Sequence, residues 1–232
     1  LAEVRDWGSA DSTLRTEEQA AIARFWGTNM VIQTNEAYRS VAAERGLNLL
    51  ETARLMAMGN MVATDSLIAT FNTKYHYSFW RPMTAIRHTN PDNSYSAGEL
   101  NTWMPLMPTP NFPEYVAGHG SFASSQAEVY AQFFGTNQIE LTLQDGMGNT
   151  RHYATAADLR QEVIDARTWG GMHFRTSTLL ATRLGQRLVT DALATYFLPD
   201  PGTDTLQHAT ISGGIRKFVD GLPGLGSGSA NN

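Results

Sequence analysis

Residues 74–82 read Lys74-Tyr75-His76-Tyr77-Ser78-Phe79-Trp80-Arg81-Pro82, so two cations seven positions apart bracket a mostly aromatic segment. Proline disfavours the α conformation in the residue before it, which predicts that Arg81 stands in an extended or turn geometry at a helix end. Lys74 and Arg81, held among aromatic rings, would form an anion-binding pair in which a point charge lies beside a planar fork. The alternative is a pair of surface cations that flank a core-facing aromatic run.

The composition excludes several classes of protein and site. The chain has 232 residues, 42% of them hydrophobic, which is enough for one large domain or two small ones with a real core. A net charge of -5 argues against a nucleic-acid partner. Without cysteine there are no disulfides, thiolate metal sites or cysteine nucleophiles. No apolar run reaches the roughly eighteen residues of a membrane span.

The apolar pattern predicts a mainly α protein, a helical bundle with one small β-hairpin. The predicted helices start at Thr16, cover 29–45, run from the cap Asn48 to about Thr73, cover 83–88, run from His119 or Gly120 to Gly135, run from Thr155 or Asp158 to Arg167, and cover 172–197. The helix after Asn48 is apolar on more than one face, which predicts a central place in the bundle. Alternation at Ile139, Leu141 and Leu143 predicts the hairpin over 138–153.

The remaining segments set the expected domain organisation. Residues 1–12 are expected to be irregular or the remnant of an earlier element, and dense Pro and Asn punctuation predicts a long functional loop over 89–113. Residues 1–199 are expected to form one catalytic helical-bundle domain, and 200–232 a Gly-rich tail that is partly disordered. Because the sequence starts at Leu1 without Met, we expect a processed or trimmed product that lacks an N-terminal portion of the fold.

A second informative stretch is 112–121, which reads Phe-Pro-Glu-Tyr-Val-Ala-Gly-His-Gly-Ser and delivers Gly118-His119-Gly120 to a helix start. Glycine lets the backbone approach a ligand closely, and the free N–H groups of a helix N-terminus bind anions. A histidine at this point can donate or accept a proton. The alternative is that His119 caps its own helix.

A third stretch, 167–175, reads Arg-Thr-Trp-Gly-Gly-Met-His-Phe-Arg. At about 100° per residue, Arg167 and His173 would lie on different faces of a straight helix. The Gly170-Gly171 pair breaks that straightness, so both side chains can aim at one point. The alternative for His173 is a hydrogen-bonded core histidine. Arg175 is predicted to form a salt bridge or to lie on a helix surface.

Together the three stretches give Lys-x6-Arg-Pro, then Gly-His at a helix start, then Arg-x5-His. In this order and spacing, over residues 74–173, they resemble the vanadium-dependent haloperoxidases and the related type 2 phosphatidic acid phosphatases of one acid phosphatase superfamily. The aromatic run before Arg81-Pro82 and the Phe-Pro-Glu-Tyr approach at 112–115 are more similar to the soluble bacterial haloperoxidase-like branch. The lack of a membrane span agrees with that branch.

The resemblance implies roles for the matching positions. The oxoanion, vanadate or phosphate, would be held by Lys74, Arg81, Gly118, Arg167 and His173. His173 would be the axial vanadium ligand, or the nucleophile on phosphorus in a phosphatase. His119 would be the acid–base group near the apical oxygen. Three fixed cations suit the dense negative charge that vanadate shares with a phosphoryl transition state.

The activity implied is vanadate-dependent oxidation of halide by hydrogen peroxide to hypohalous acid, with a small organic acceptor. Two alternatives are not excluded. One is a soluble acid phosphatase that hydrolyses phosphomonoesters at the same site, and the other is a catalytically weakened oxoanion-binding relative. No nucleic acid or membrane span is expected, and the sequence leaves a homo-oligomer open. The resemblance favours a secreted or periplasmic protein.

Two positions depart from the family pattern. Ala117 stands where the family carries a serine before Gly-His, so a hydrogen bond worth about 1.5–3 kcal/mol to a charged ligand is absent. Ser177 stands four residues after His173, where many relatives have an acid that orients that histidine. Another carboxylate, with Asp165 and Asp65 as candidates, or a backbone carbonyl is expected to replace it. The other histidines are predicted to be surface or structural residues: His76, His88, His152 and His208.

Overall fold

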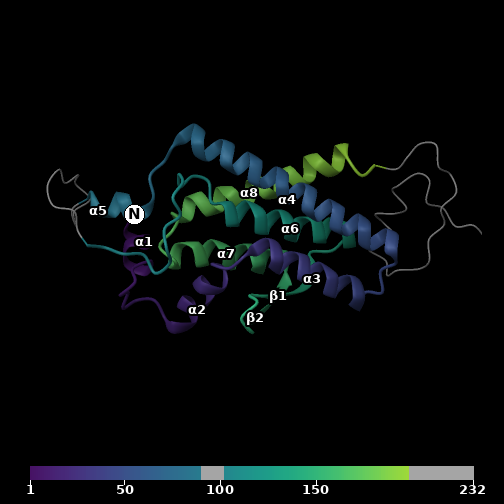
Figure 1. Ribbon diagram of the computed structural model, residues 1–232, viewed down its shortest axis with the longest axis horizontal. Helices are drawn as coiled ribbons and strands as arrows, with labels where there is room; N and C mark the ends of the chain where they lie inside the picture. Colours follow the sequence, from purple (N-terminus) through teal and green to yellow (C-terminus); the bar gives the residue numbers. More distant parts are fainter. Residues whose placement is uncertain (90–101, 199–232) are drawn as a thin grey trace, which may run out of the picture.

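The computed structural model describes residues 1–89 and 102–198, and these form an elongated helical bundle with one two-stranded antiparallel sheet (Figure 1). The elements are α1 (Ala2–Trp7), α2 (Glu17–Phe25), α3 (Met30–Glu44), α4 (Leu49–Tyr77), α5 (Pro82–Arg87), α6 (Gly118–Phe134), β1 (Gln138–Gln144), β2 (Thr150–Thr155), α7 (Ala156–Trp169) and α8 (Arg175–Thr195). The predicted fold class is therefore confirmed. Residues 1–12, expected to be irregular, instead contain the short helix α1.

The helix boundaries follow local capping chemistry. Thr16, Asn48 and Thr155 cap α2, α4 and α7, each accepting a backbone N–H while the third helical residue bonds back to the cap backbone. Gly135 ends α6 in the left-handed conformation, with φ of 66°. These signals are local in the sequence, which explains why the predicted boundaries lie within a few residues of the observed ones.

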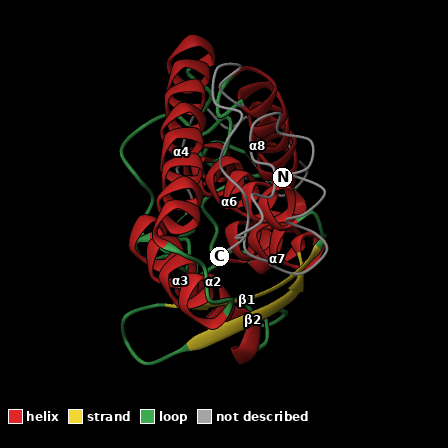
Figure 2. Ribbon diagram, turned by 90° about the vertical axis from the view of Figure 1, so that its right-hand side faces the viewer, coloured by secondary structure: helices red, strands yellow, loops and turns green. Residues whose placement is uncertain are grey.

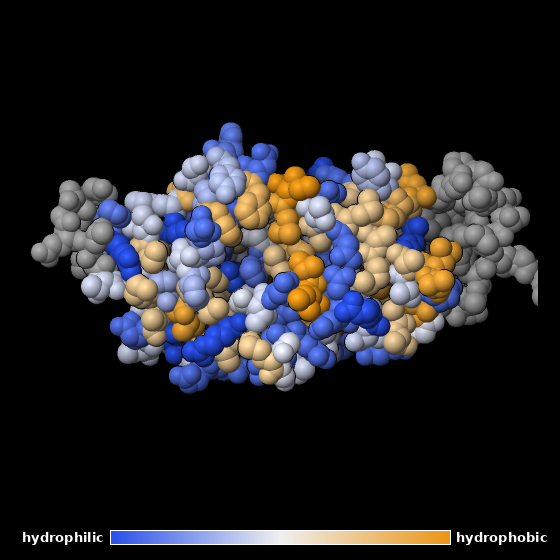
Figure 3. Space-filling view, viewed as in Figure 1, coloured by the Kyte–Doolittle hydropathy of each residue, from blue (hydrophilic) through white to orange (hydrophobic). Residues whose placement is uncertain are grey.

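The centre of the bundle is α6 rather than α4. Thirteen of the seventeen residues of α6 are buried, and it packs against α4, α7 and α8. The prediction that α4 is central is wrong, because large apolar side chains of α4 face outward: Met61 is 50% exposed, Ile68 62% and Phe71 37%. Patches of hydrophobic surface are visible among polar ones on the face shown in Figure 3.

The hairpin closes one side of the bundle. In β1, Ile139, Leu141 and Leu143 alternate with exposed residues and are fully buried, as predicted. These side chains join the main apolar core, with β1 packed against α3 and β2 against α7. Figure 2 shows the pair of strands along one edge of the molecule, on the side away from α4 and α8. The hairpin therefore supports the core and leaves the ends of α4, α6, α7 and α8 free to carry a site.

The remaining segments agree with their predicted character where they are described. Residues 102–113 contain no helix or strand, and Pro105 forms an isolated bridge with Ser9. The predicted tail 200–232 and much of the loop 89–113 lie outside the described residues. No helix of the described ranges is long and apolar enough to cross a membrane.

Close packing of α6 against α8 requires glycine on both helices. A Cβ at Gly185 would lie 2.3 Å from the backbone oxygen of Ser121, and one at Gly120 would lie 2.9 Å from the backbone oxygen of Thr178. Backbone atoms of a central helix cannot rotate away as a side chain can. We therefore expect Gly185→Ala to lower the free energy of unfolding by about 2 kcal/mol in denaturant titrations, although alanine is the better helix former.

The exposed Thr190→Ala in the same helix is the control, and we expect a change within about 0.5 kcal/mol. Stabilisation by Gly185→Ala would contradict the close approach of the two helices.

Candidate functional site

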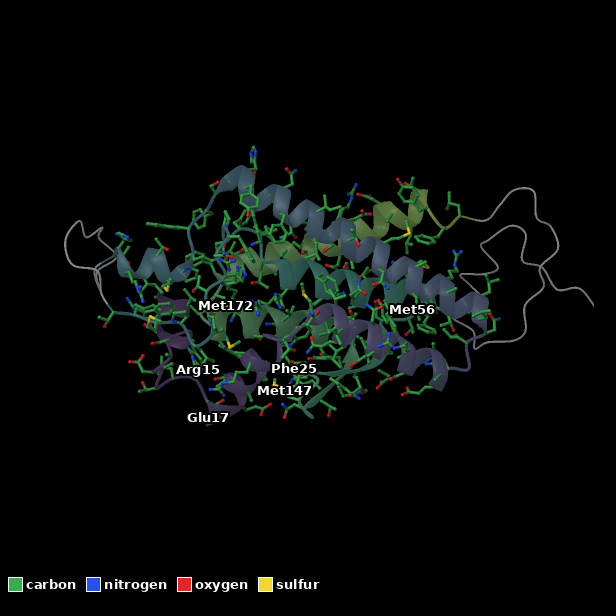
Figure 4. The ribbon with its side chains drawn as sticks, viewed as in Figure 1. Arg15, Glu17, Phe25, Met56, Met147 and Met172 are labelled. Atoms are coloured by element: carbon green, nitrogen blue, oxygen red, sulfur yellow. The ribbon has the colours of Figure 1, made fainter. Side chains whose placement is uncertain are left out.

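Five helices deliver the predicted site residues to one end of the bundle. Lys74 lies in the last turn of α4, Arg81 at the N-cap of α5, His119 in the first turn of α6, and Arg167 in the last turn of α7. His173 precedes α8, one residue before its N-cap. Met172, labelled in Figure 4, marks this end of the bundle, and Met56 on α4 lies toward the other end.

Arg81 has the geometry that its proline predicts. Its backbone is extended, with φ of -76° and ψ of 156°, directly before Pro82 at the start of α5. The side chain is 5% exposed; its Nε donates to the Phe112 carbonyl at 3.0 Å and its Nη1 to the Met172 carbonyl at 3.0 Å. Nη2 is buried and has no hydrogen-bond partner within residues 1–89 and 102–198. The reading of Arg81 as a surface cation is therefore wrong.

Lys74 is also buried, at 1% exposure, and is held by the approach loop. Its Nζ donates to the carbonyls of Pro113 at 2.9 Å and Glu114 at 2.8 Å. The ring of Phe112 lies 5.3 Å from Lys74 Nζ and 5.1 Å from the Arg81 guanidinium carbon. Both cations thus contact one aromatic ring, which favours their charged forms and excludes water.

A turn that only glycine adopts easily brings Arg167 to the same point. Gly171 has φ of 73°, and the amides of Met172 and His173 bond back to the Arg167 carbonyl, each at 3.3 Å. The guanidinium of Arg167 is buried, and Nη1 donates to the Trp26 carbonyl at 2.8 Å. Its Nε has no partner in the described part of the chain. The glycine pair therefore breaks the helix between Arg167 and His173 as predicted.

The hydrogen bonds of His173 define its tautomer. Arg81 Nη1 lies 3.1 Å from His173 Nε2, and a guanidinium can only donate, so Nε2 carries the lone pair. The proton is therefore on Nδ1, which donates to Glu114 Oε1 at 2.7 Å. The Phe174 amide donates to the same oxygen at 3.1 Å. This arrangement fixes the ring and presents an unprotonated Nε2 to the cationic side of the site.

Glu114 is the carboxylate that orients His173. The prediction that Asp165 or Asp65 has this role is wrong. Asp165 accepts from Arg175 and Gln161 instead, and Asp65 is an exposed residue of α4. Arg175 forms ion pairs with Glu3 and Asp165, as predicted for it. Sequence reasoning missed Glu114 because it lies 59 residues from His173. Its place between Pro113 and the Gly-His helix start was the available signal.

His119 lies beside the three cations. Burial, followed by the charges of Arg167 and Lys74, holds its pKa well below the usual range. A hydrogen bond with the Thr28 backbone acts in the opposite direction. His119 Nε2 is buried without a hydrogen-bond partner among the described residues, and in a neutral ring one of the two nitrogens carries a lone pair. With the proton on Nδ1, the Nε2 lone pair is free to accept a proton.

Burial and mutual repulsion dominate the electrostatics of the cluster. Burial, and then the charge of Arg81, lower the pKa of Lys74 to about 7 and that of Arg167 to about 9. Burial lowers the pKa of Arg81 to about 10 and raises that of Glu114 to about 7. One carboxyl cannot neutralise three buried cations, so an anion is the complementary ligand.

The family's serine hydroxyl is replaced by a small apolar side chain. Ala117 is the N-cap of α6 and makes no side-chain cap bond. It is fully buried in a small apolar cluster with Val116 and Ala181. Gly118 follows as the first helical residue, where N–H groups have no partner within the helix. The first turn of α6 therefore offers its backbone N–H groups to an anion, but position 117 has no hydroxyl to add.

The donor set fits a tetrahedral oxoanion better than a metal cation. The buried Arg81 Nη2 and Arg167 Nε are N–H donors without partners in the described ranges, and His119 Nε2 also lacks a partner there. Among the same residues, no group of three His, Asp or Glu side chains could hold a cation. Convergent donors from two arginines and a lysine match the oxygens of vanadate or phosphate.

Comparison with known proteins identifies the family. Residues 54–197, more than half of the chain, match the family model described as the VCPO second helical-bundle domain. The chain belongs to the vanadium haloperoxidase family. Over 146 residues, 53% of this chain and 24% of the relative, it is 25% identical to the vanadium chloroperoxidase of Curvularia inaequalis.

Solved structures show the same fold. A bacterial vanadium-dependent iodoperoxidase superposes with a TM-score of 0.65 at 23% identity, covering 77% of this chain and 44% of that one. The apo-type bacterial vanadium-dependent chloroperoxidase gives a TM-score of 0.64 at 20% identity, covering 82% of this chain and 46% of that one. The chain spans less than half the length of these relatives.

The buried Arg167 should reduce stability in the absence of an anion. Replacing buried ionic networks with apolar side chains of similar volume is often neutral or stabilising by about 1–4 kcal/mol. Arg167 forms no ion pair with a carboxylate within the described ranges, so its removal leaves no buried carboxylate unpaired. We therefore expect Arg167→Met to keep or raise the midpoint of thermal unfolding without added anion. The same variant should lose the rise in midpoint that sulfate or phosphate gives the wild type.

Arg183→Met, at an exposed arginine of α8, is the matched control and should retain the anion-dependent rise. A large loss of stability in Arg167→Met, or a retained response to sulfate, would contradict a cation cluster built for an anion.

The pKa shifts set the pH dependence of anion binding. A bound dianion favours charged Lys74 and neutral Glu114, so above about pH 7 binding requires proton uptake by both groups. Sulfate affinity should then fall as pH rises through 7, by up to about tenfold per pH unit for each group. Calorimetric titration with sulfate measures this, because sulfate keeps its charge across the range.

Lys74→Met should bind sulfate more weakly and with a shallower dependence on pH. An affinity that is constant between about pH 6 and pH 9 would show that neither group faces the anion.

Proposed function

We propose that this chain binds vanadate between α4, α6, α7 and α8 and is a vanadate-dependent haloperoxidase that oxidises halide with hydrogen peroxide to hypohalous acid. The observation that carries the proposal is the set of three buried cations near Nε2 of His173, of which Arg81 and Arg167 have N–H groups without a partner among the described residues. The three cations come from separate helices, so the fold itself assembles them. Bound vanadate would supply the Lewis acidity that activates peroxide toward halide.

Each residue then has one task. Lys74, Arg81 and Arg167 hold the oxygens of the anion and offset its charge without giving up protons of the arginines. The Gly118 amide adds a backbone donor at the start of α6. His173 offers Nε2 to vanadium, and Glu114 keeps the proton on Nδ1 so that this lone pair stays available.

His119 is the proposed acid–base group. With the proton on Nδ1, the partnerless Nε2 can take a proton from hydrogen peroxide and return it later. Burial and the surrounding cations hold the pKa of His119 well below its usual range and keep the ring neutral before the reaction, which is the state that a general base requires. The other reaction partners are a halide and a small organic acceptor.

A soluble acid phosphatase is the second candidate, and the tautomer of His173 is the observation that favours it. An unprotonated Nε2 held by a buried carboxylate is also a suitable nucleophile toward phosphorus. Vanadate-supported bromination of a dye with peroxide favours the haloperoxidase. Phosphomonoester hydrolysis inhibited by vanadate favours the phosphatase. Anion binding without either activity identifies a catalytically weakened relative.

The two histidines should separate binding from turnover. We expect His173→Ala to abolish vanadate binding in calorimetric titrations, since the axial ligand is gone. We expect His119→Ala to bind vanadate within about threefold of the wild type and to lose about 100-fold or more in peroxidase turnover.

The matched control is His152→Ala, at an exposed histidine of the hairpin that pairs with Glu140, and it should change neither property. Full turnover by His119→Ala would exclude the acid–base role, and tight vanadate binding by His173→Ala would exclude the axial role.

A further inference from the structure

A cavity lies beside Glu114, on the side away from the proposed vanadate ligands. Its volume is about 560 Å³, within the range of small-molecule pockets. The residues that line it are Leu1, Tyr77, Phe79, Glu114, Tyr115, Phe174, Thr176 and Ser177. None of the proposed vanadate ligands belongs to this set, so the cavity is separate from the oxoanion site and shares with it the carboxyl that orients His173.

The walls of the cavity are aromatic. Tyr77 and Tyr115 meet edge to face with ring centroids 5.4 Å apart, and Phe79 and Phe174 do so at 5.9 Å. These side chains come from the end of α4, the turn after it, the approach to α6 and the N-cap of α8. Rings arranged this way present faces and edges on which another aromatic ring can stack.

Two lining residues, Glu114 and Ser177, have buried polar atoms without a hydrogen bond of normal geometry among the described residues. Glu114 Oε1 accepts from the ring of His173 and the amide of Phe174, but the buried Oε2 has no hydrogen-bond partner within the described ranges. The Ser177 hydroxyl lies near enough to lower the pKa of this carboxyl, yet it too is buried without a bond of normal geometry. Buried polar atoms without partners are rare, and a ligand donor would satisfy them.

We propose that this cavity binds a small neutral aromatic molecule that carries one O–H or N–H donor, with the ring between the aromatic walls and the donor directed at Glu114 Oε2 and Ser177. The choice of a neutral molecule follows from the surroundings. Glu114 is the one Asp, Glu, His, Lys or Arg among the described residues that line the cavity, and it already interacts with Lys74 and Arg81. A positively charged ligand here would be repelled by those two cations. The site requires no oxidation chemistry and stands apart from the haloperoxidase proposal.

Phenol and toluene form a probe pair of nearly equal shape that differs in the donor. We expect phenol titrated into the 232-residue chain to shift the backbone amide resonances of Phe174, Thr176 and Ser177. Phenol should bind about tenfold more tightly than toluene, because its O–H can bond to oxygen acceptors that toluene cannot use. Equal affinity of the two probes would overturn the proposed ligand class.

Pocket filling tests the location without touching the vanadate ligands. Thr176 is exposed at the rim, so Thr176→Trp should occupy the cavity and remove the phenol-induced shifts. Thr190→Trp, at another exposed threonine of α8, should leave them unchanged. Vanadate binding by Thr176→Trp, measured in parallel, reports that the fold is intact. Phenol-induced shifts that persist in Thr176→Trp would overturn the site.

Discussion

The candidate site depends on the burial of three cations beside one another. Lys74, Arg81 and Arg167 are almost entirely removed from water, and among the described residues Glu114 is the carboxyl whose charge opposes those of Lys74 and Arg81. Some of their N–H groups donate to backbone carbonyls of the loop before α6, the end of α2 and the turn before α8. Arg81 Nη2 and Arg167 Nε have no partner among the described residues. An anion bound between them would satisfy these groups and offset the cost of burying the cations.

The rest of the fold places these groups. Glycines at the α6–α8 contact bring the two helices close enough for the start of α6 to lie beside the start of α8. Gly171 reverses the chain so that Arg167 and His173 face the same point. Phe112 lies against both Lys74 and Arg81 and keeps them apart from solvent. Glu114 lies four residues before α6. Its carbonyl accepts from Lys74, its carboxyl accepts from His173, and the residue also lines the aromatic cavity.

Much of the fold and most of the site were predictable, because the relevant signals are local in the sequence. Capping residues such as Thr16 and Asn48, the alternation in β1, and Pro82 after Arg81 each act within a few residues. The orienting role of Glu114 could not be derived in this way, since it depends on a contact across 59 residues. The place of α4 was mispredicted because apolar residues on several faces also occur on a helix with an exposed hydrophobic side.

In the proposed site, an oxoanion lies at this end of the bundle and would bond to His173. A structure of the protein from crystals grown with vanadate is the sharpest test. We expect an anion bonded to His173 Nε2, with its oxygens contacted by Lys74, Arg81, Arg167 and the Gly118 amide. A structure with no anion between these residues, or with Arg81 still bonded to His173 Nε2 and vanadate bound elsewhere, would contradict it.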